Sequence, residues 1–347
     1  MLEQPHKPYT AVVADFQQLQ PVGSGGKCRF HCTGINQHGE KVAGGTGDKV
    51  TLTTVYRTAD EEHLLFLNRI REQQPDRLCL DEYFADRHWP SSGPYQEMTL
   101  QECVAKGMEL AAGTSEVFTW LTSTNRGASE VCEAALLNKG ITVADTEQGF
   151  DCDPASLSTL GILANTGIVL RLTRNLDKSR GFVNGAICIV VERLRGNAYF
   201  VAKLVGSGNY VLVHPIKEGD KDLLPCCYGY ATTIRRAQGA SLSMGCIYFD
   251  HKYAKAGRGR GYGYVAVSRF RSRGGVYLYG HKRRTDFLPV GGNPEEEHLK
   301  RGYESETEDE DVMPEYAMVE NECNRGVEFG EGYVEPPPDF DIHMLDA

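Results

Sequence analysis

The sequence predicts an α/β protein that carries a small all-β unit within it. Candidate strands alternate with amphipathic helices over residues 56–170 and again over 229–292, which is typical of α/β folds. Five short β-rich runs occupy the middle of the chain, at 167–173, 185–194, 197–205, 209–216 and 223–228. Turn signals such as Asn184-Gly185 separate these runs, and their spacing indicates a small barrel inserted in the α/β chain.

Apolar spacing and capping residues predict the individual elements. Leu64, Leu67 and Ile70 recur at helical spacing and predict a helix over residues 61–72. Asn125 is placed to cap a helix over 126–138, which Gly140 ends. The remaining candidate helices cover 80–88, 99–111 and 263–270, and the candidate strands outside the β-rich runs cover 10–15, 116–121, 228–234, 246–250 and 275–279.

Charge is distributed unevenly along the chain. The formal net charge is −10, yet residues 293–347 alone carry 18 acidic and 3 basic residues. Residues 1–292 therefore carry 29 acidic and 34 basic residues, a net charge of +5, and residues 230–285 hold 12 Lys and Arg against one acid, Asp250. A basic body favours an anionic partner, although a merely solvated surface would have the same composition. The acidic segment 293–347 is predicted to be a disordered tail.

Composition also bears on compartment and on metal binding. No apolar run approaches the roughly 18–20 residues that a membrane span needs, and the first residues lack the features of a signal peptide, so we expect an intracellular protein, nuclear or cytoplasmic, without membrane contact. The 11 cysteines are scattered and odd in number, which favours reduced thiols. The densest group, Cys28, His31, Cys32 and His38, lacks a second ligand pair, and no metal site is predicted.

Several segments resemble helicase motifs, and the strongest lie near the end of the basic body. Residues 264–272, YVAVSRFRS, are nearly identical to motif VI of superfamily 1 helicases, and residues 231–242, ATTIRRAQGASL, resemble motif V. Residues 12–22, VVADFQQLQPV, resemble motif III. Further matches at 55–72, 121–136 and 175–190 stand in the same order as in the PIF/RecD-type helicases, so the resemblance to that family covers about residues 12–292.

The resemblance implies a domain organisation. Residues 56–170 and 229–292 would form a RecA-like domain of the P-loop NTPase class, domain 2A of such helicases, and residues 171–228 would form its inserted SH3-like barrel, domain 2B. Residues 1–55 would be a remnant of the first RecA-like domain, 1A, ahead of these two parts and the tail.

The resemblance also implies roles for particular residues. It makes Arg269 the arginine finger, Arg57 a second arginine near the γ-phosphate, and Gln18 a γ-phosphate sensor, because phosphoryl transfer needs charge placed around the transferring group. Residues implied to bind nucleotide are Asp15, Gln238 and Gly239, and those implied to bind DNA are Thr124, Asn125, Thr233, Arg235 and Arg236. Simpler roles stay open: a surface ion pair for Arg269, a polar loop for Gln18, and helix capping alone for Thr124 and Asn125.

The phosphate-binding loop expected of such a motor is not found in the sequence. Lys27 follows a Gly-rich stretch, but Pro21 stands where the first glycine of a P-loop belongs and Cys28 stands where Ser or Thr would hold Mg²⁺. No Asp-Glu pair follows a hydrophobic strand before motif III. We therefore expect a truncated ATP-dependent 5′-to-3′ DNA helicase whose full-length relatives use ATP and Mg²⁺. Alone it would not hydrolyse ATP, and its partners would be single-stranded or forked DNA and a missing N-terminal helicase half.

Two alternatives remain open at this stage. The chain could be a non-catalytic module that binds single-stranded nucleic acid, with Tyr228, Tyr230, Tyr262 and Tyr264 as candidate base-stacking residues. It could also be an inert, decayed fragment of a mobile-element helicase.

Overall fold

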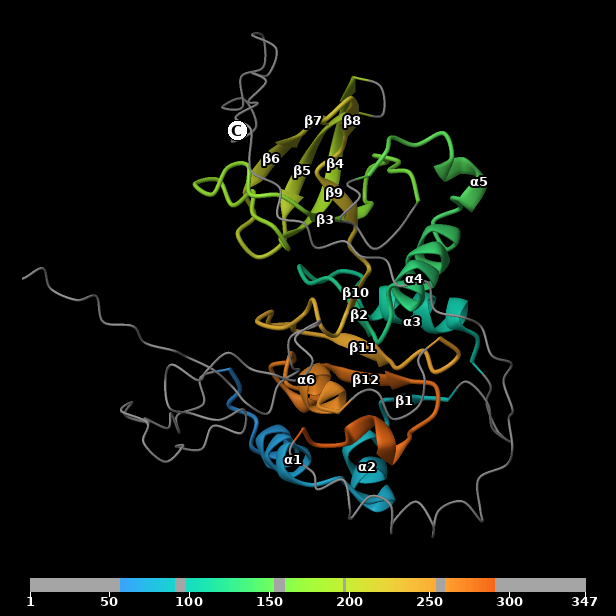
Figure 1. Ribbon diagram of the computed structural model, residues 1–347, viewed down its shortest axis with the longest axis vertical. Coiled ribbons are helices and arrows are strands. Elements are labelled where there is room, and N and C mark those ends of the chain that lie inside the picture. Colours follow the sequence, from blue (N-terminus) through green and yellow to red (C-terminus); the bar gives the residue numbers. More distant parts are fainter. Residues whose placement is uncertain (1–56, 91–97, 153–159, 196–197, 254–259, 291–347) are drawn as a thin grey trace, which may run out of the picture.

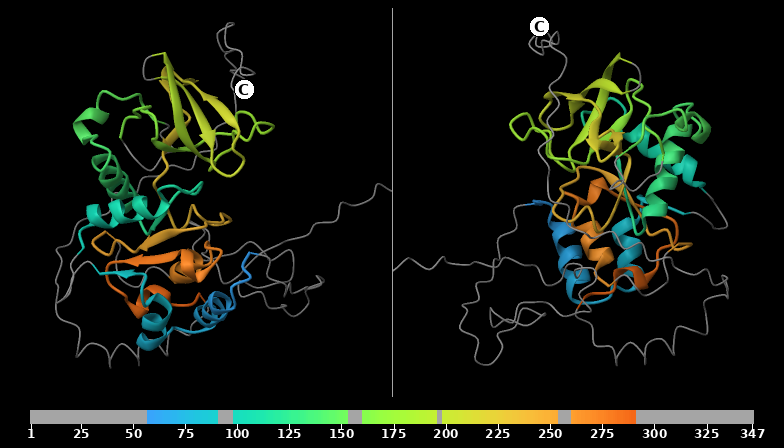
Figure 2. Two further views of the ribbon diagram at one scale, coloured as in Figure 1. Left: turned by 180° about the vertical axis from the view of Figure 1, so that it is seen from behind. Right: turned by 45° about the horizontal axis from the view of Figure 1, so that its top comes forward.

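The computed structural model contains two sheets, one parallel and one antiparallel, and it describes residues 57–90, 98–152, 160–195, 198–253 and 260–290. The antiparallel sheet lies above the parallel sheet in Figure 1, and the two views of Figure 2 show the same arrangement. The chain runs through the first part of the parallel sheet, builds the antiparallel sheet, and then returns. The expectation of an α/β protein with an inserted β-rich unit is met at this level.

The parallel sheet has five strands that all run in the same direction. In spatial order they are β1 (His88–Trp89), β12 (Val276–Tyr279), β11 (Gly245–Tyr248), β2 (Thr119–Thr122) and β10 (Ala231–Thr233). Because every neighbouring pair is parallel, the carboxyl ends of all five strands lie at one edge of the sheet and the amino ends at the other.

Helices cover both faces of this sheet. The α-helices are α1 (Glu61–Glu72), α2 (Arg77–Phe84), α3 (Leu100–Ala111), α4 (Asn125–Leu137), α5 (Val143–Thr146) and α6 (Tyr262–Val267), with 3₁₀ turns η2 (Arg273–Gly275) and η3 (Arg284–Phe287). Helices α3 and α4 pack on one face, whereas α1, α2 and α6 pack on the other. Side chains of a strand alternate between the two cores: Trp120 belongs to the first and Leu121 to the second.

The antiparallel sheet accounts for all five predicted β-rich runs. It has the order β6 (Tyr210–Val213), β5 (Tyr199–Leu204), β4 (Ile187–Arg195), β3 (Val169–Leu172) and β9 (Cys226–Tyr228). A hairpin of β7 (Ile216–Glu218) and β8 (Lys221–Leu223) lies between β6 and β9 in the chain. In this order β6 and β9 are the edge strands, so the closed SH3-like barrel stays a prediction.

The chain passes from one sheet to the other through a short, buried junction. Strand β9 ends at Tyr228 and β10 begins at Ala231, so Gly229 and Tyr230 join the two sheets. A Cβ on Gly229 would lie 2.8 Å from the Leu170 backbone, which explains why glycine is needed there. The Tyr228 and Tyr230 side chains are each only 2% exposed and their hydroxyls bond to backbone, so the proposed base stacking by these two residues is wrong.

Several local expectations need correction. The helix predicted over residues 80–88 is α2, which begins earlier, at Arg77, because Asp76 caps it by accepting a hydrogen bond from the Cys79 amide. It also ends earlier, at Phe84, and His88 is the first residue of β1. In α1 the buried residues are His63, Phe66 and Ile70. The buried face of this helix is therefore rotated from the predicted one, which contained Leu64 and Leu67. The cap of α4 is Thr124, and Asn125 is the first helical residue. The predicted strand 10–15 and the acidic tail lie outside the described residues.

Candidate nucleic-acid interface

Three neighbouring strands deliver polar residues to the carboxyl edge of the parallel sheet. Thr122, the last residue of β2, pairs with Thr233 at the end of β10 and with Tyr248 at the end of β11. The segments that follow these strands therefore start side by side (Figure 1). The ends of these strands and the segments that follow them contain every residue that the sequence assigned to DNA binding. Polar groups gathered where parallel strands end are typical of ligand sites in α/β folds.

The turn after β2 is organised around Thr124. Its side-chain oxygen accepts a hydrogen bond of 3.1 Å from the Gly127 amide and so caps α4. The same hydroxyl donates to the carboxylate of Asp250, and the Ser123 amide donates to that carboxylate at 2.7 Å. The Thr124 hydroxyl thus donates its one proton within the fold, whereas the neighbouring Asn125 is exposed. Of the two residues in this turn that the sequence assigned to DNA binding, Asn125 is the more exposed.

Asp250 is the residue of this edge that sequence reasoning did not assign. It is completely buried, follows β11, and has a left-handed backbone with φ of 30°. Burial raises the pKa of its carboxyl, and the hydrogen bonds from Thr124 and Ser123 oppose that rise. A Cβ on Gly127 would collide with this carboxylate, so α4 can approach Asp250 only because Gly127 has no side chain. The available signal was that Asp250 is the one acid among residues 230–285.

The turn after β10 presents the two arginines of the motif V segment. Thr233 is buried, and its hydroxyl accepts a hydrogen bond of 3.3 Å from the Arg236 amide, which tightens the turn. The Arg235 guanidinium lies 5.9 Å from the centre of the Tyr262 ring, at the start of α6. The Arg236 side chain is exposed. Thr233 therefore shapes the turn, and the arginines provide its outward-facing charge.

The second predicted group, Arg57 and Arg269, is brought together near the end of α6. Arg269 is 1% exposed, and its guanidinium donates to the Val265 carbonyl at 3.0 Å and to the Ser268 hydroxyl at 2.7 Å. Arg57 donates to the Ser268 carbonyl at 2.8 Å. The alternative of a surface ion pair is wrong for Arg269, because its side chain is buried.

The backbone that carries Arg269 is fixed from several sides. The Leu242 amide donates to the Arg269 carbonyl at 2.8 Å, and Asp60 accepts a hydrogen bond of 2.8 Å from the Arg273 amide. His63 Nε2 lies 3.2 Å from the Phe270 carbonyl, and His63 Nδ1 lies 2.6 Å from the Tyr83 hydroxyl. Helix α1 thus holds the segment after α6 through polar contacts.

The two predicted groups occupy opposite edges of one sheet. The stretch from Thr233 to Leu242 leaves β10 at the carboxyl edge and reaches the beginning of β11 at the amino edge, where Leu242 pairs with Phe270. Gln238 and Gly239 lie on this stretch, and Gly239 has a φ of 87°, which favours glycine. Asp15 and Gln18 lie outside the described residues. The motif V segment is one of the connections that run from the carboxyl edge to the amino edge.

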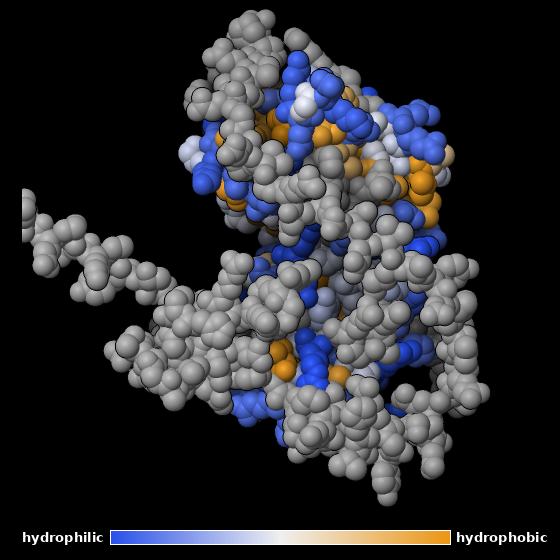
Figure 3. All heavy atoms as spheres, viewed as in Figure 1, coloured by the Kyte–Doolittle hydropathy of each residue, from blue (hydrophilic) through white to orange (hydrophobic). Residues whose placement is uncertain are grey.

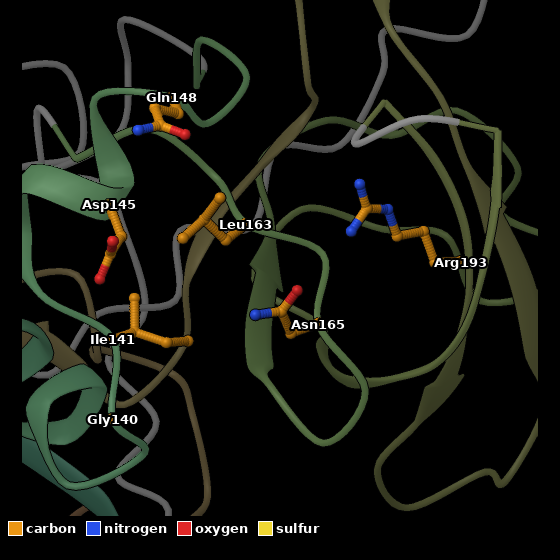
Figure 4. A pocket seen from close by; sticks show the side chains of 7 residues that line it. All are labelled: Gly140, Ile141, Asp145, Gln148, Leu163, Asn165 and Arg193. Atoms are coloured by element: carbon orange, nitrogen blue, oxygen red, sulfur yellow. The ribbon is translucent and has the colours of Figure 1, made fainter.

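A separate pocket of about 380 Å³ contains none of the predicted site residues. Figure 4 shows Asp145 and Gln148 on one side and Asn165 and Arg193 on the other, where the end of α4 and α5 approach the antiparallel sheet. On the face seen in Figure 3, hydrophobic side chains show on the antiparallel sheet, with hydrophilic ones beside them.

The described residues contain neither a metal-binding cluster nor a helix that could span a membrane. No group of three or more His, Cys, Asp or Glu side chains in the described ranges is arranged to hold a metal ion. None of the helices described here combines the length and the apolar character that crossing a membrane requires.

Comparison with solved structures gives matches to Pif1 helicases. A Bacteroides Pif1 in complex with ADP-AlF3 and ssDNA aligns with 18% identity, over 74% of this chain and 57% of that one, with a TM-score of 0.47. The Candida albicans Pif1 helicase aligns with 15% identity, over 77% and 63%, with a TM-score of 0.49. The chain thus spans less than two thirds of these relatives. No family model and no curated protein sequence matches it.

Proposed function

We propose that this chain is the second motor domain of a PIF-type superfamily 1 helicase and that it binds single-stranded DNA along the carboxyl edge of its parallel sheet. The proposal is supported by the ordered motifs in the sequence and by one observation above all. Residues of two separate motif segments, Asn125 in one and Arg235 and Arg236 in the other, follow β2 and β10, which are hydrogen-bonded neighbours in the sheet. A phosphate-binding edge is what translocation along a strand requires.

The second group supports a role in nucleotide hydrolysis by the complete motor. Arg269 would act as the arginine finger and Arg57 would stand beside it, because both bond to Ser268. Gln18 and Asp15 would complete the γ-phosphate side, with Gln238 and Gly239 near the nucleotide. ATP and Mg²⁺ would be the cofactors of the whole protein. The chain by itself would not hydrolyse ATP, since its sequence contains no GxxxxGK[ST] loop.

A salt titration of DNA binding tests the proposal. We expect the chain to bind a mixed-sequence single-stranded oligonucleotide, measured by fluorescence anisotropy, with affinity that falls steeply as salt rises. The double variant Arg235→Ala/Arg236→Ala should bind all sequences more weakly and should flatten the slope of log K against log salt by about one to two units. Each single variant, Arg235→Ala and Arg236→Ala, is compared with Arg69→Ala, which is on α1, is paired with Asp76 and removes one positive charge elsewhere.

A second candidate function is non-catalytic binding of single-stranded nucleic acid. The structural feature that favours it is the exposed Arg236 side chain at the carboxyl edge, since binding an anion there needs no nucleotide. An ATPase assay of the same protein distinguishes the two functions. If DNA-stimulated ATP hydrolysis appears after addition of a protein domain that carries a P-loop, the helicase role is supported. Absence of DNA binding at any salt concentration would contradict both.

A further inference from the structure

We propose that Arg126, held against the ring of Tyr253, is an additional binding site for the phosphodiester backbone of single-stranded nucleic acid. Neither residue belongs to the set that the motifs assign. The inference rests on the proposed function, because it extends the same carboxyl edge beyond Asn125. It is carried by a cluster of one aromatic ring, two cations and one carboxylate that two neighbouring elements bring together.

The geometry of the cluster is specific. The Arg126 guanidinium carbon lies 4.4 Å from the centre of the Tyr253 ring, and Lys252 Nζ lies 4.9 Å from the same centre. The Tyr253 hydroxyl donates to the carboxylate of Glu130, one turn further along α4. Cations within about 6 Å of a ring centre are attracted by the negative face of the ring, so the contact holds the Arg126 side chain in place.

The charges of the cluster distinguish its two cations. Lys252 Nζ lies 2.8 Å from a Glu130 carboxylate oxygen, so its charge is balanced locally. No carboxylate among the described residues forms an ion pair with Arg126, whose only recorded side-chain partner there is the Tyr253 ring. Arg126 is also exposed. It is therefore the cation of this cluster that is available to an anion.

The backbone on both sides of the cluster is fixed by Asp250. The Asp250 carboxylate accepts hydrogen bonds from Ser123 and Thr124, just before Arg126. The Asp250 carbonyl accepts one of 2.9 Å from the Tyr253 amide. One buried residue thus sets the position of both the guanidinium and the ring. A guanidinium that is already oriented loses less conformational freedom when it binds a phosphate, and its planar fork suits phosphate oxygens.

The succession of polar and basic residues along the carboxyl edge favours a polymeric anion over a single small one. Arg126 directly follows Asn125, and both turns, after β2 and after β10, begin beside each other. A strand that contacts Arg236 and Asn125 would meet Arg126 with its next phosphates. An acidic peptide would find the same charge, and it is the competing occupant in the test.

The experiment measures single-stranded oligonucleotide affinity of the full chain against salt. We expect Arg126→Ala to bind about fivefold more weakly at 0.1 M salt and to flatten the log K against log salt slope by about 0.7, the value for one single-strand phosphate contact. Arg126→Gln should behave in the same way, and it guards against misfolding of the alanine variant. Arg69→Ala, which removes one charge on α1, should change affinity much less.

Variants of Tyr253 test the role of the ring. Tyr253→Phe keeps the ring and should keep wild-type affinity, whereas Tyr253→Leu should weaken binding two- to threefold without changing the salt slope, because no charge is lost. If the wild type binds DNA but Arg126→Ala lowers DNA affinity no more than Arg69→Ala does, the inference fails and the proposed function stands. If a poly-glutamate peptide binds the wild type and loses affinity with Arg126→Ala while DNA does not, the occupant is an acidic peptide and the inference also fails. A wild type that does not bind DNA overturns both.

Discussion

At the scale of single residues, His63 shows how a buried polar group fixes a functional segment. The Phe270 carbonyl can only accept, so His63 Nε2 must carry the proton in this contact, and the neutral ring then accepts from the Tyr83 hydroxyl at Nδ1. Burial lowers the pKa of His63 and raises that of Tyr83, in agreement with a neutral ring and a protonated phenol. The chain of hydrogen bonds ends on the residue next to Arg269.

His63 should give the protein a defined pH dependence. Because its folded-state pKa is depressed, the unfolded state binds more protons between that value and about 6.5, and the free energy of unfolding should fall as pH is lowered through this window. His63→Gln should be less stable at pH 7 but should show a flatter dependence between pH 7 and 5. Urea denaturation at a series of pH values measures this.

A second buried histidine provides the control. Burial also lowers the pKa of His88, whose Nε2 bonds to the Gly280 carbonyl, so it contributes with the same sign. His88→Gln should therefore remove only the contribution of His88 to the pH dependence of the free energy of unfolding. The contribution of His63 should remain. A His63→Gln variant with the wild-type slope would contradict the neutral, buried ring.

At the scale of elements, α4 depends on its contact with Asp250. Asparagine looks like a good cap from sequence, and Asn125 does stand at the start of the helix. Thr124 is the cap because its hydroxyl faces both the Gly127 amide and the Asp250 carboxylate. The helix start is thus selected by a residue more than a hundred positions away, which no local pattern contains.

Gly127→Ala should destabilise the protein, because the new methyl group meets the buried Asp250 carboxylate. Overpacking of this kind costs about 1–3 kcal/mol, and the better helix propensity of alanine offsets up to about 1 kcal/mol of it. Gly274→Ala is the control, since a Cβ there has no heavy atom within 4 Å and should change stability by less than about 0.5 kcal/mol. Equal urea midpoints for the two variants would show that the α4–Asp250 contact can relax without cost.

At the scale of the whole molecule, the charge division between residues 1–292 and 293–347 should influence DNA binding. The acidic segment carries a net charge of −15 against +5 for the rest, so we expect it to compete with DNA phosphates for the same basic surface. Removing residues 293–347 should strengthen oligonucleotide binding at low salt, and the gain should shrink as salt screens the interaction. Anisotropy titrations of both proteins at 50 and 300 mM salt provide the comparison, and equal affinities at 50 mM would refute the competition.

The sequence by itself determined the elements and the class of fold. Apolar spacing predicted α1, α3, α4, the five strands of the antiparallel sheet and four strands of the parallel sheet, because helical and strand periods are local properties of the chain, whereas β1 begins in a segment predicted as helix. The motif segments also predicted roles for Arg57 and Arg269 near the γ-phosphate, which stay predictions, and in the structure both side chains bond to Ser268.

Only the tertiary structure decided which distant residues meet. Arg57 and Ser268 are 211 positions apart, and Thr124 and Asp250 are 126 apart, so their contacts depend on the strand order β1-β12-β11-β2-β10. That order follows from how crossover connections pack helices on the two faces of the sheet, which is a property of the whole core. For the same reason Asp250, Tyr253 and His63 entered the candidate sites only when the folded chain brought them beside the motif residues.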